Sequence, residues 1–282
     1  MKKYLNKITC GDSYKLIKEL PDKSVDCIYT DIPYLYNQGG SGNSDLGERT
    51  AKKRLELMGA SDKYLNDNTT RKEALRIAKN TAKKHLDFIS IEDGIDYAIL
   101  DDFVRVMKKI NCFIWCSKLQ IFDIMKYFLG GGIDREIYFE ILTWNKTNPT
   151  PTINNAWLPD IEYCLYFREK GVHYNSGYEL KNKWFISSAN KSDKDLFSHP
   201  TIKPIELVKR HLLHTTQPND IVLDCFMGSG TTAVACQETN RQFIGFEIEQ
   251  KWVDIANGRL KGLNAEEVKN GQISIFELLG DK

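Results

Sequence analysis

A tetrapeptide with side chains that could bind an amine, Asp31-Ile32-Pro33-Tyr34, follows a predicted strand over residues 25–30. The exocyclic amine of adenine or cytosine is a poor nucleophile because its lone pair is delocalised into the ring. The Asp31 carboxylate and the Ile32 carbonyl, next to a rigid proline, would supply two preorganised acceptors for the amine hydrogens. The Tyr34 ring could stack on a base outside the duplex. Such a tetrapeptide is also common as a plain turn, so its meaning depends on its surroundings.

A second candidate site is a glycine turn between a predicted buried strand, residues 221–225, and a helix that starts at Thr231. Gly228 and Gly230 would let the backbone pass close to a ligand. The next predicted strand, residues 242–247, ends at Glu247, an acid that could hold ribose hydroxyls. Taken alone, this unit could equally serve a nicotinamide or flavin dinucleotide or be a tight structural turn.

The elements that must position these two runs alternate along the chain. Periodicity and β-branched or aromatic content predict strands over seven segments, namely residues 8–10, 25–30, 112–116, 136–144, 161–167, 221–225 and 242–247. Helical spacing predicts helices over residues 13–20, 97–109 and 122–129, and more helices alternate with strands after residue 199. This order predicts an α/β fold with a Rossmann-like, doubly wound, mostly parallel sheet.

Two longer runs, in a fixed order, carry a family resemblance. They are His199-Pro200-Thr201-Ile202-Lys203-Pro204-Ile205-Glu206-Leu207 and Asp224-Cys225-Phe226-Met227-Gly228-Ser229-Gly230-Thr231-Thr232. With the tetrapeptide, the chain resembles the beta-class amino-methyltransferases of DNA, the adenine-N6/cytosine-N4 family. The resemblance covers residues 8–34, 144–167 and, most strongly, 199–260. It implies the class I methyltransferase fold with a circularly permuted motif order, and S-adenosylmethionine as the methyl donor.

The resemblance also implies roles for individual residues. Asp12 matches the acid that contacts the cofactor adenine, and Glu247 matches the acid on its ribose. His199 and Lys203 match positions that approach the cofactor, and Lys203 would be a cation for the methionine carboxylate. Phe226, Gly228, Ser229, Gly230 and Thr231 match the turn around the methionine moiety, and Asp224 is a further cofactor-binding candidate. The catalytic residues would be Asp31, Ile32, Pro33 and Tyr34.

Position 32 departs from the family pattern, which usually has proline there. Isoleucine supplies the same carbonyl acceptor, but it has an amide N–H and a freer φ, so some rigidity is lost. Pro33 still biases Ile32 toward an extended geometry. We therefore expect activity. Asp31 favours adenine as the target, because cytosine-N4 members usually carry serine at that position.

DNA contacts are expected from two regions. Residues 49–84 hold eleven Lys/Arg against four Asp/Glu, a local balance of +7. This insert is either a solvated helical face or a phosphate-binding surface that uses Lys52, Lys53 and Arg54. Residues 168–198 mix basic and aromatic side chains, including Lys181 and Lys183, and are either a target-recognition region or a surface loop.

The resemblance divides the chain into six parts. Residues 1–36 would hold the catalytic motif, and residues 37–95 are expected to form a mobile loop and the basic insert. Residues 96–167 complete the catalytic half, and residues 168–198 are the small candidate DNA-recognition region. Residues 199–263 form the S-adenosylmethionine half, and residues 264–282 are a C-terminal extension.

Composition narrows the class of protein. Among 282 residues, 41% are hydrophobic and 27% charged, which is typical of globular proteins, and the net charge is only +1. No apolar run approaches the ~20 residues of a membrane span, and no signal peptide is visible. The seven cysteines are scattered, so we expect reduced structural thiols, and neither they nor the histidine pair His211 and His214 predicts a metal site.

The leading hypothesis is therefore a cytoplasmic, bacterial or phage-encoded methyltransferase that modifies adenine N6 in double-stranded DNA by base flipping. The alternatives are cytosine-N4 methylation and a catalytically silent DNA-binding homologue. A dinucleotide-dependent oxidoreductase is the weakest, because Asp31 and its neighbours have no use in hydride transfer. The resemblance is also compatible with a homodimer and a cognate restriction endonuclease, and no membrane partner is expected.

Overall fold

A computed structural model describes residues 1–35, 94–149, 157–175, 177–188 and 202–263. The chain divides into two compact units, residues 1–32 with 96–282 and residues 33–95. Of the smaller unit, the described ranges include only 33–35 and 94–95. The helices and strands below therefore belong to the larger unit.

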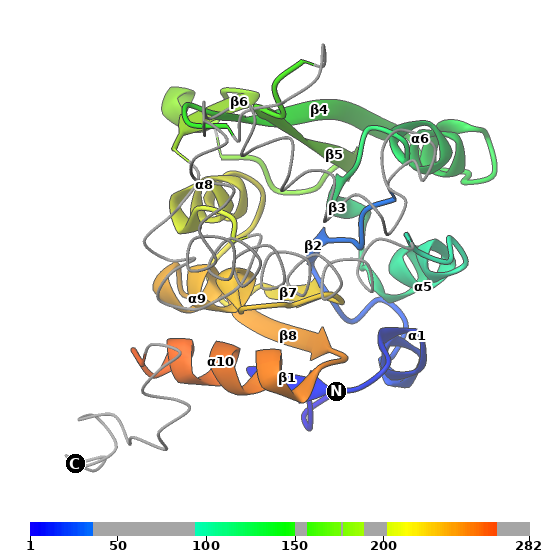
Figure 1. Cartoon of the computed structure of the whole chain (residues 1–282). Helices are drawn as coiled ribbons and strands as arrows, with labels where there is room; N and C mark the ends of the chain where they lie inside the picture. Colours follow the sequence, from blue (N-terminus) through cyan, green and yellow to red (C-terminus); the bar gives the residue numbers. More distant parts are fainter. Residues whose placement is uncertain (36–93, 150–156, 176, 189–201, 264–282) are drawn as a thin grey trace, which may run out of the picture. The chain divides into compact units, whose positions relative to one another are not determined.

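The larger unit is built on one eight-stranded sheet (Figure 1). Its strands are β1 (Lys7–Cys10), β2 (Cys27–Asp31), β3 (Asn111–Cys116), β4 (Ile137–Lys146), β5 (Ile161–Glu169), β6 (Trp184–Ser187), β7 (Ile221–Asp224) and β8 (Gln242–Glu247). They lie in the order β1-β8-β7-β2-β3-β5-β4-β6. Only β5 runs against the others, because it pairs antiparallel with both β3 and β4. The predicted mostly parallel sheet is confirmed.

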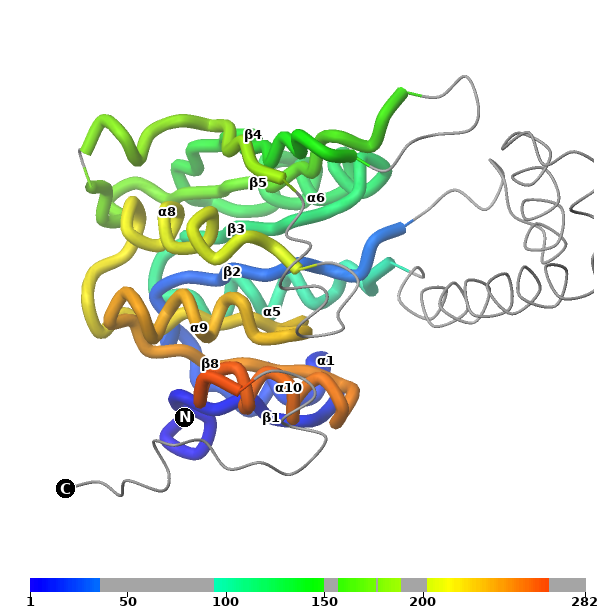
Figure 2. Tube along the Cα trace, turned by 60° about the vertical axis from the view of Figure 1, so that its left-hand side comes forward, coloured from blue at the N-terminus to red at the C-terminus, as the bar shows by residue number. Residues whose placement is uncertain are grey.

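Helices cover both faces of this sheet (Figures 1 and 2). On one side lie α8 (Ile205–Thr215), α9 (Thr231–Glu238) and α10 (Gln250–Leu260). On the other side lie α1 (Ser13–Leu16), α5 (Ile99–Val106) and α6 (Ile121–Leu129). The remaining described elements are two 3₁₀ turns, η1 (Ile17–Glu19) and η2 (Tyr178–Leu180). All six residues of β3 are buried, as expected for a central strand covered on both faces.

Three expected elements differ in detail. The helix predicted over 13–20 is divided into α1 and η1, and the helix predicted over 97–109 ends at Val106. It ends there because Met107 is extended and forms a bridge with Val25, and Lys108 N–H donates to the Val25 carbonyl at 2.9 Å. The recognition region predicted over 168–198 contributes β6, which joins the edge of the main sheet beside β4.

The strand directions bring the candidate residues to one edge of the sheet. The parallel strands β1, β2, β3, β7 and β8 all end at this edge, as does β4, and the reversed strand β5 begins there. The order of connections reverses between β7 and β2, because α9 leads from β7 to β8 on one side while β2 neighbours β3 on the other. Ligands of open α/β sheets bind at such a switch point, beyond the carboxyl ends of the strands.

Candidate active site

The glycine turn between β7 and α9 depends on two left-handed residues, Gly228 with φ 53° and Gly230 with φ 84°. A Cβ on Gly230 would lie 2.8 Å from the Cβ of Ala256 in α10, so the turn also needs glycine for close packing. The Gly228 N–H donates to Glu247 Oε2 at 2.8 Å, which joins the turn to the end of β8. The turn is thus held in shape on two sides.

Asp224, the last residue of β7, has both carboxylate oxygens engaged inside the protein. Its Oδ1 accepts from Thr30 Oγ1 at 2.8 Å and from the Phe226 N–H at 3.0 Å. Its Oδ2 accepts from Thr232 Oγ1 at 2.6 Å. Burial raises the pKa of Asp224 to about 6, and these hydrogen bonds oppose the rise. Because Thr30 precedes Asp31, this carboxylate ties the glycine turn to the strand of the tetrapeptide. A cofactor contact by Asp224 stays a prediction.

Two further acids end the neighbouring strands β8 and β1. Glu247 is 9% exposed, and its Oε1 accepts from the Glu249 N–H at 3.0 Å. Burial raises the pKa of Glu247, and backbone hydrogen bonds oppose the rise. Asp12 follows β1 and caps α1 by accepting from the Tyr14 N–H at 3.0 Å. The two strand ends are joined, since the Gly11 N–H donates to the Glu247 carbonyl at 2.8 Å.

Arg259 in α10 supports the turn, and sequence reasoning missed it. Arg259 is 7% exposed, and its Nη1 donates to Thr231 Oγ1 at 2.9 Å and to the Ser229 carbonyl at 3.3 Å. No spacing along the sequence indicates this contact, because it depends on how α10 packs against α9. The buried Arg259 side chain therefore belongs with the residues that hold the glycine turn in shape.

The tetrapeptide begins where β2 ends. The Ile32 N–H donates to the Trp115 carbonyl at 3.1 Å, so the pairing of β2 with β3 continues one residue beyond the strand. Ile32 is 2% exposed. Proline at this position would lack that N–H. A hydrogen bond and a buried side chain therefore hold position 32 in place of a proline ring. Pro33 and Tyr34, which follow directly along the chain, belong to the smaller unit.

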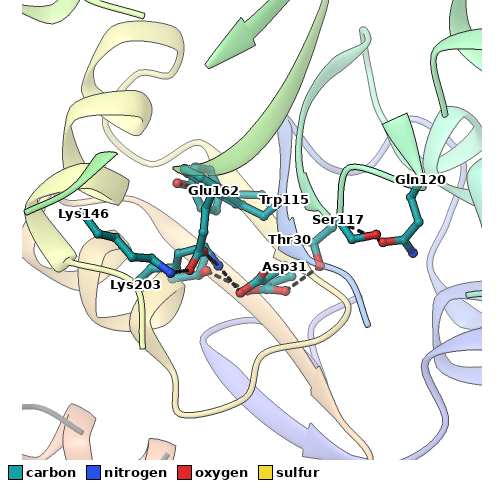
Figure 3. Close-up of polar contacts among 11 residues, drawn as sticks. Thr30, Asp31, Trp115, Ser117, Gln120, Lys146, Glu162 and Lys203 are labelled. Atoms are coloured by element: carbon teal, nitrogen blue, oxygen red, sulfur yellow. Dashed lines mark hydrogen bonds and ion pairs between the residues drawn. The ribbon is translucent and has the colours of Figure 1, made fainter. Parts of the chain in front are cut away.

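Asp31 is the first member of a row of four charged side chains of alternating sign (Figure 3). The Lys203 ammonium bonds Asp31 Oδ2 and lies 2.9 Å from Glu162 Oε2. Glu162 Oε1 in turn lies 2.5 Å from Lys146 Nζ. The residues come from the ends of β2 and β4, the start of β5 and the segment before α8. We call this set the ion row.

Within the ion row, opposite charges outweigh burial. Burial alone would raise the pKa of Glu162, but the ammonium groups of Lys203 and Lys146 lower it to about 2. Burial would lower the pKa of Lys203, yet the carboxylates of Asp31 and Glu162 hold it above its ordinary value. Both groups are therefore charged at neutral pH.

Lys203 lies near the predicted catalytic acid, and its assignment to the methionine carboxylate stays a prediction. Its Nζ is also 5.0 Å from the centre of the Trp115 ring. Sequence reasoning missed Glu162, Lys146 and Trp115 as residues of the site. Lys146, the last residue of β4, reaches the site through its ion pair with Glu162.

The remaining predicted residues lie apart from this edge or outside the described ranges. Lys181 and Lys183 are exposed just before β6, and Lys183 forms an ion pair with Glu140. His199, Lys52, Lys53 and Arg54 lie outside the described residues.

Among the described residues, neither the pair His211 and His214 nor the cysteines belong to a cluster of side chains that could bind a metal ion. His211 is buried, stacks on Phe113 and has Tyr29 as a hydrogen-bond partner at 3.2 Å. Among the described residues, His, Cys, Asp and Glu form no group of three suited to a metal ion. The seven cysteines, all in described ranges, are free thiols. Within those ranges no helix has the length and apolar character needed to cross a bilayer.

Comparisons with known proteins point to one family. A family model described as DNA methylase matches residues 25–258. The Type II methyltransferase M2.LlaDCHI of Lactococcus lactis subsp. cremoris is 31% identical over 266 residues, which cover 89% of this chain and 87% of that protein. The Type II methyltransferase M2.DpnII of Streptococcus pneumoniae is 29% identical, with 93% of this chain and 94% of that protein covered.

Solved structures share the fold. The M1.HpyAVI–SAM complex superposes with a TM-score of 0.54 at 24% identity, and the match covers 90% of this chain and 99% of that one. The cytosine-N4-specific PvuII DNA methyltransferase gives a TM-score of 0.56 at 15% identity, with 93% and 89% covered.

Proposed function

The chain belongs to the DNA methylase family, and we propose that it transfers a methyl group from S-adenosylmethionine to the N6 amine of adenine in double-stranded DNA. One observation carries the proposal. The Asp224 carboxylate accepts from Thr30 and from the Phe226 N–H, so a single buried group joins the strand of Asp31 to the glycine turn. The proposed amine acceptor and the glycine turn therefore follow neighbouring strands at one sheet edge.

The donors and acceptors at this edge fit S-adenosylmethionine. The carboxylates of Glu247 and Asp12 end adjacent strands and suit the ribose hydroxyls and the adenine amine. Backbone between residues 226 and 231, shaped by Gly228 and Gly230, suits the methionine moiety. When bound, the cofactor supplies an electrophilic methyl group on a sulfonium.

The protein's own residues would activate the amine. The Asp31 carboxylate and the Ile32 carbonyl accept its two hydrogens, which localises the nitrogen lone pair toward the incoming methyl group. As the carbon–nitrogen bond forms and the carbon–sulfur bond breaks, positive charge moves onto the nitrogen. The Asp31 carboxylate would stabilise that charge, and one amine hydrogen would then leave as a proton to solvent.

The DNA substrate calls for base extrusion and backbone contacts. Removing a base from the stack costs a few kcal/mol, and stacking on Tyr34 would offset part of that cost. Lys181 and Lys183 are exposed cations that would bind phosphates, as would Lys52, Lys53 and Arg54 of the insert. A homodimer and a cognate restriction endonuclease stay predictions.

The proposal is tested with purified protein, labelled S-adenosylmethionine and unmethylated DNA, followed by mass spectrometry of the nucleosides. We expect N6-methyladenine from the wild type and at least a hundredfold slower transfer from Asp31→Ala, as for loss of one preorganised group (~10²–10³). S-adenosylmethionine binding should be nearly unchanged in that variant.

Asp22→Asn is the matched control, because Asp22 is another acid of the same unit whose side chain is 73% exposed. It should transfer methyl groups at the wild-type rate. Wild-type transfer by Asp31→Ala would refute the role of Asp31, and N4-methylcytosine as the product would refute adenine as the target.

A further inference from the structure

The four side chains of the ion row differ in how deeply they are buried, and an amine acceptor alone does not require such an arrangement. The Lys203 side chain is only 6% exposed, whereas those of Glu162, Lys146 and Asp31 are 15%, 19% and 28% exposed. Lys203 is thus the most buried charge, and it lies between the two carboxylates (Figure 3). A buried cation placed directly against the proposed catalytic acid calls for an explanation.

The Lys203 ammonium lies against the buried ring of Trp115. Its Nζ lies 5.0 Å from the centre of the Trp115 ring, a distance suited to a cation–π contact. Trp115 is fully buried, and its indole N–H donates to Tyr29 Oη at 3.0 Å. The Trp115 carbonyl accepts from the Ile32 N–H. The same residue therefore contacts Lys203 through its side chain and the tetrapeptide through its backbone.

The charges of the ion row balance. Lys203 paired with Asp31 alone would hold that carboxylate as a tight counter-ion and weaken it as an acceptor. Glu162 takes part of the lysine charge, and Lys146 bonds the other oxygen of Glu162. Among these four side chains the two cations match the two anions, and buried ionic groups are tolerated when they are paired in this way.

We propose that Lys203, Glu162 and Lys146 are positioning residues that hold the Asp31 carboxylate ionised and oriented toward the amine. This inference rests on the proposed function. It assigns Lys203 to the catalytic carboxylate rather than to the methionine carboxylate. An ionised carboxylate only accepts hydrogen bonds, whereas a protonated one presents a donor that would oppose the amine.

The decisive variant is Lys203→Met, measured in the full chain by single-turnover methylation at saturating S-adenosylmethionine and by binding of S-adenosylmethionine alone. We expect the methylation rate to fall roughly 10- to 100-fold, as for a small misplacement of a reacting group. The cofactor Kd should stay within about twofold, and Lys203→Arg should regain part of the rate. A Kd raised tenfold or more with an unchanged rate would overturn the inference.

Glu162→Gln and its combination with Lys146→Met test the balance of charge. The single variant leaves two lysines facing one carboxylate, so the rate should fall roughly tenfold. The double variant restores one cation to one anion and should be faster than Glu162→Gln alone. A wild-type rate for Glu162→Gln would contradict the proposal. Lys108→Met is the control, because Lys108 pairs with Asp26 just before the start of β2, far along the strand from Asp31.

A readout that does not depend on methylation separates this inference from the proposed function. In the wild type, ¹³C NMR should show the Glu162 carboxylate ionised down to acid pH, because its pKa is about 2. Lys203→Met should move that titration upward toward the ordinary glutamate range. An unmoved titration in a folded variant refutes the ion row, whereas failure of the wild type to methylate adenine refutes the proposed function.

Discussion

Replacing Ile32 by the proline usual in the family tests whether the hydrogen bond from the Ile32 N–H fixes the backbone at this position, as a proline ring would. The Ile32 N–H donates to the Trp115 carbonyl at 3.1 Å, and both residues are almost fully buried. Proline removes this donor and leaves the Trp115 carbonyl without that partner. It also replaces a larger side chain that is 2% exposed.

The expected cost follows from these contacts. An unsatisfied buried carbonyl costs about 1–3 kcal/mol, and a small loss of buried side chain adds about 0.5–1.5 kcal/mol. The reduced freedom of the unfolded chain returns about 0.4–1 kcal/mol. Ile32→Pro should therefore lower the free energy of unfolding by about 0.5–4 kcal/mol, and each kcal/mol corresponds to roughly 2–4 °C in Tm.

The assay is thermal or urea unfolding of the purified variant, with Ile32→Val as the matched control. Valine keeps the N–H and should cost only about 0.5–1.5 kcal/mol. Because proline retains the carbonyl acceptor of residue 32, the methylation rate of Ile32→Pro should stay within about threefold of the wild type. A proline variant as stable as the wild type would refute the role given to this hydrogen bond.

Three further predictions follow from the described contacts. Gly230→Ala forces a Cβ to 2.8 Å from Ala256 at a φ of 84°, so S-adenosylmethionine binding and Tm should both fall, and unchanged calorimetry would contradict the packing. Burial lowers the pKa of His211 to about 3. In the unfolded chain His211 binds a proton below its ordinary pKa of about 6.5, whereas in the folded chain it stays neutral down to about pH 3. The free energy of unfolding should therefore fall by up to about 2 kcal/mol between pH 7 and pH 5. His211→Phe should reduce that loss in urea titrations, and an equal loss would assign it to other groups. Charge removal at Lys181 and Lys183 should weaken DNA binding and lower the salt slope by up to about two, and an unchanged slope would exclude both from phosphate contact.

The fold was predictable where hydrophobic pattern and chain order determine it. Alternation of strands and helices predicted the parallel sheet. Asp31 stood out because it follows a predicted strand and Glu247 because it ends one, and in the structure β2 and β8 end at these two acids. The early end of α5 was not predictable from helical spacing. It depends on a backbone bridge from Met107 to a segment about 80 residues earlier in the chain.

The ion row was not predictable for a similar reason. Lys146 and Glu162 lie in strands where isolated polar residues are ordinary, and only the register that places Trp144 opposite Glu162 brings them together. Trp115 belongs to an apolar run that predicted a buried strand, which is correct. Its contacts with Lys203 and Ile32 depend on neighbours from distant parts of the chain, and no local pattern records them.

The most direct test of adenine methylation by this protein is expression of the full chain in a host that lacks DNA methylation, followed by modification-sensitive long-read sequencing of the host DNA. We predict N6-methyladenine at one short sequence motif, and its absence when Asp31→Ala is expressed at the same level. N4-methylcytosine would contradict adenine as the target. Unmodified DNA from cells that hold folded protein able to bind S-adenosylmethionine would contradict the proposed catalytic role of the sheet edge.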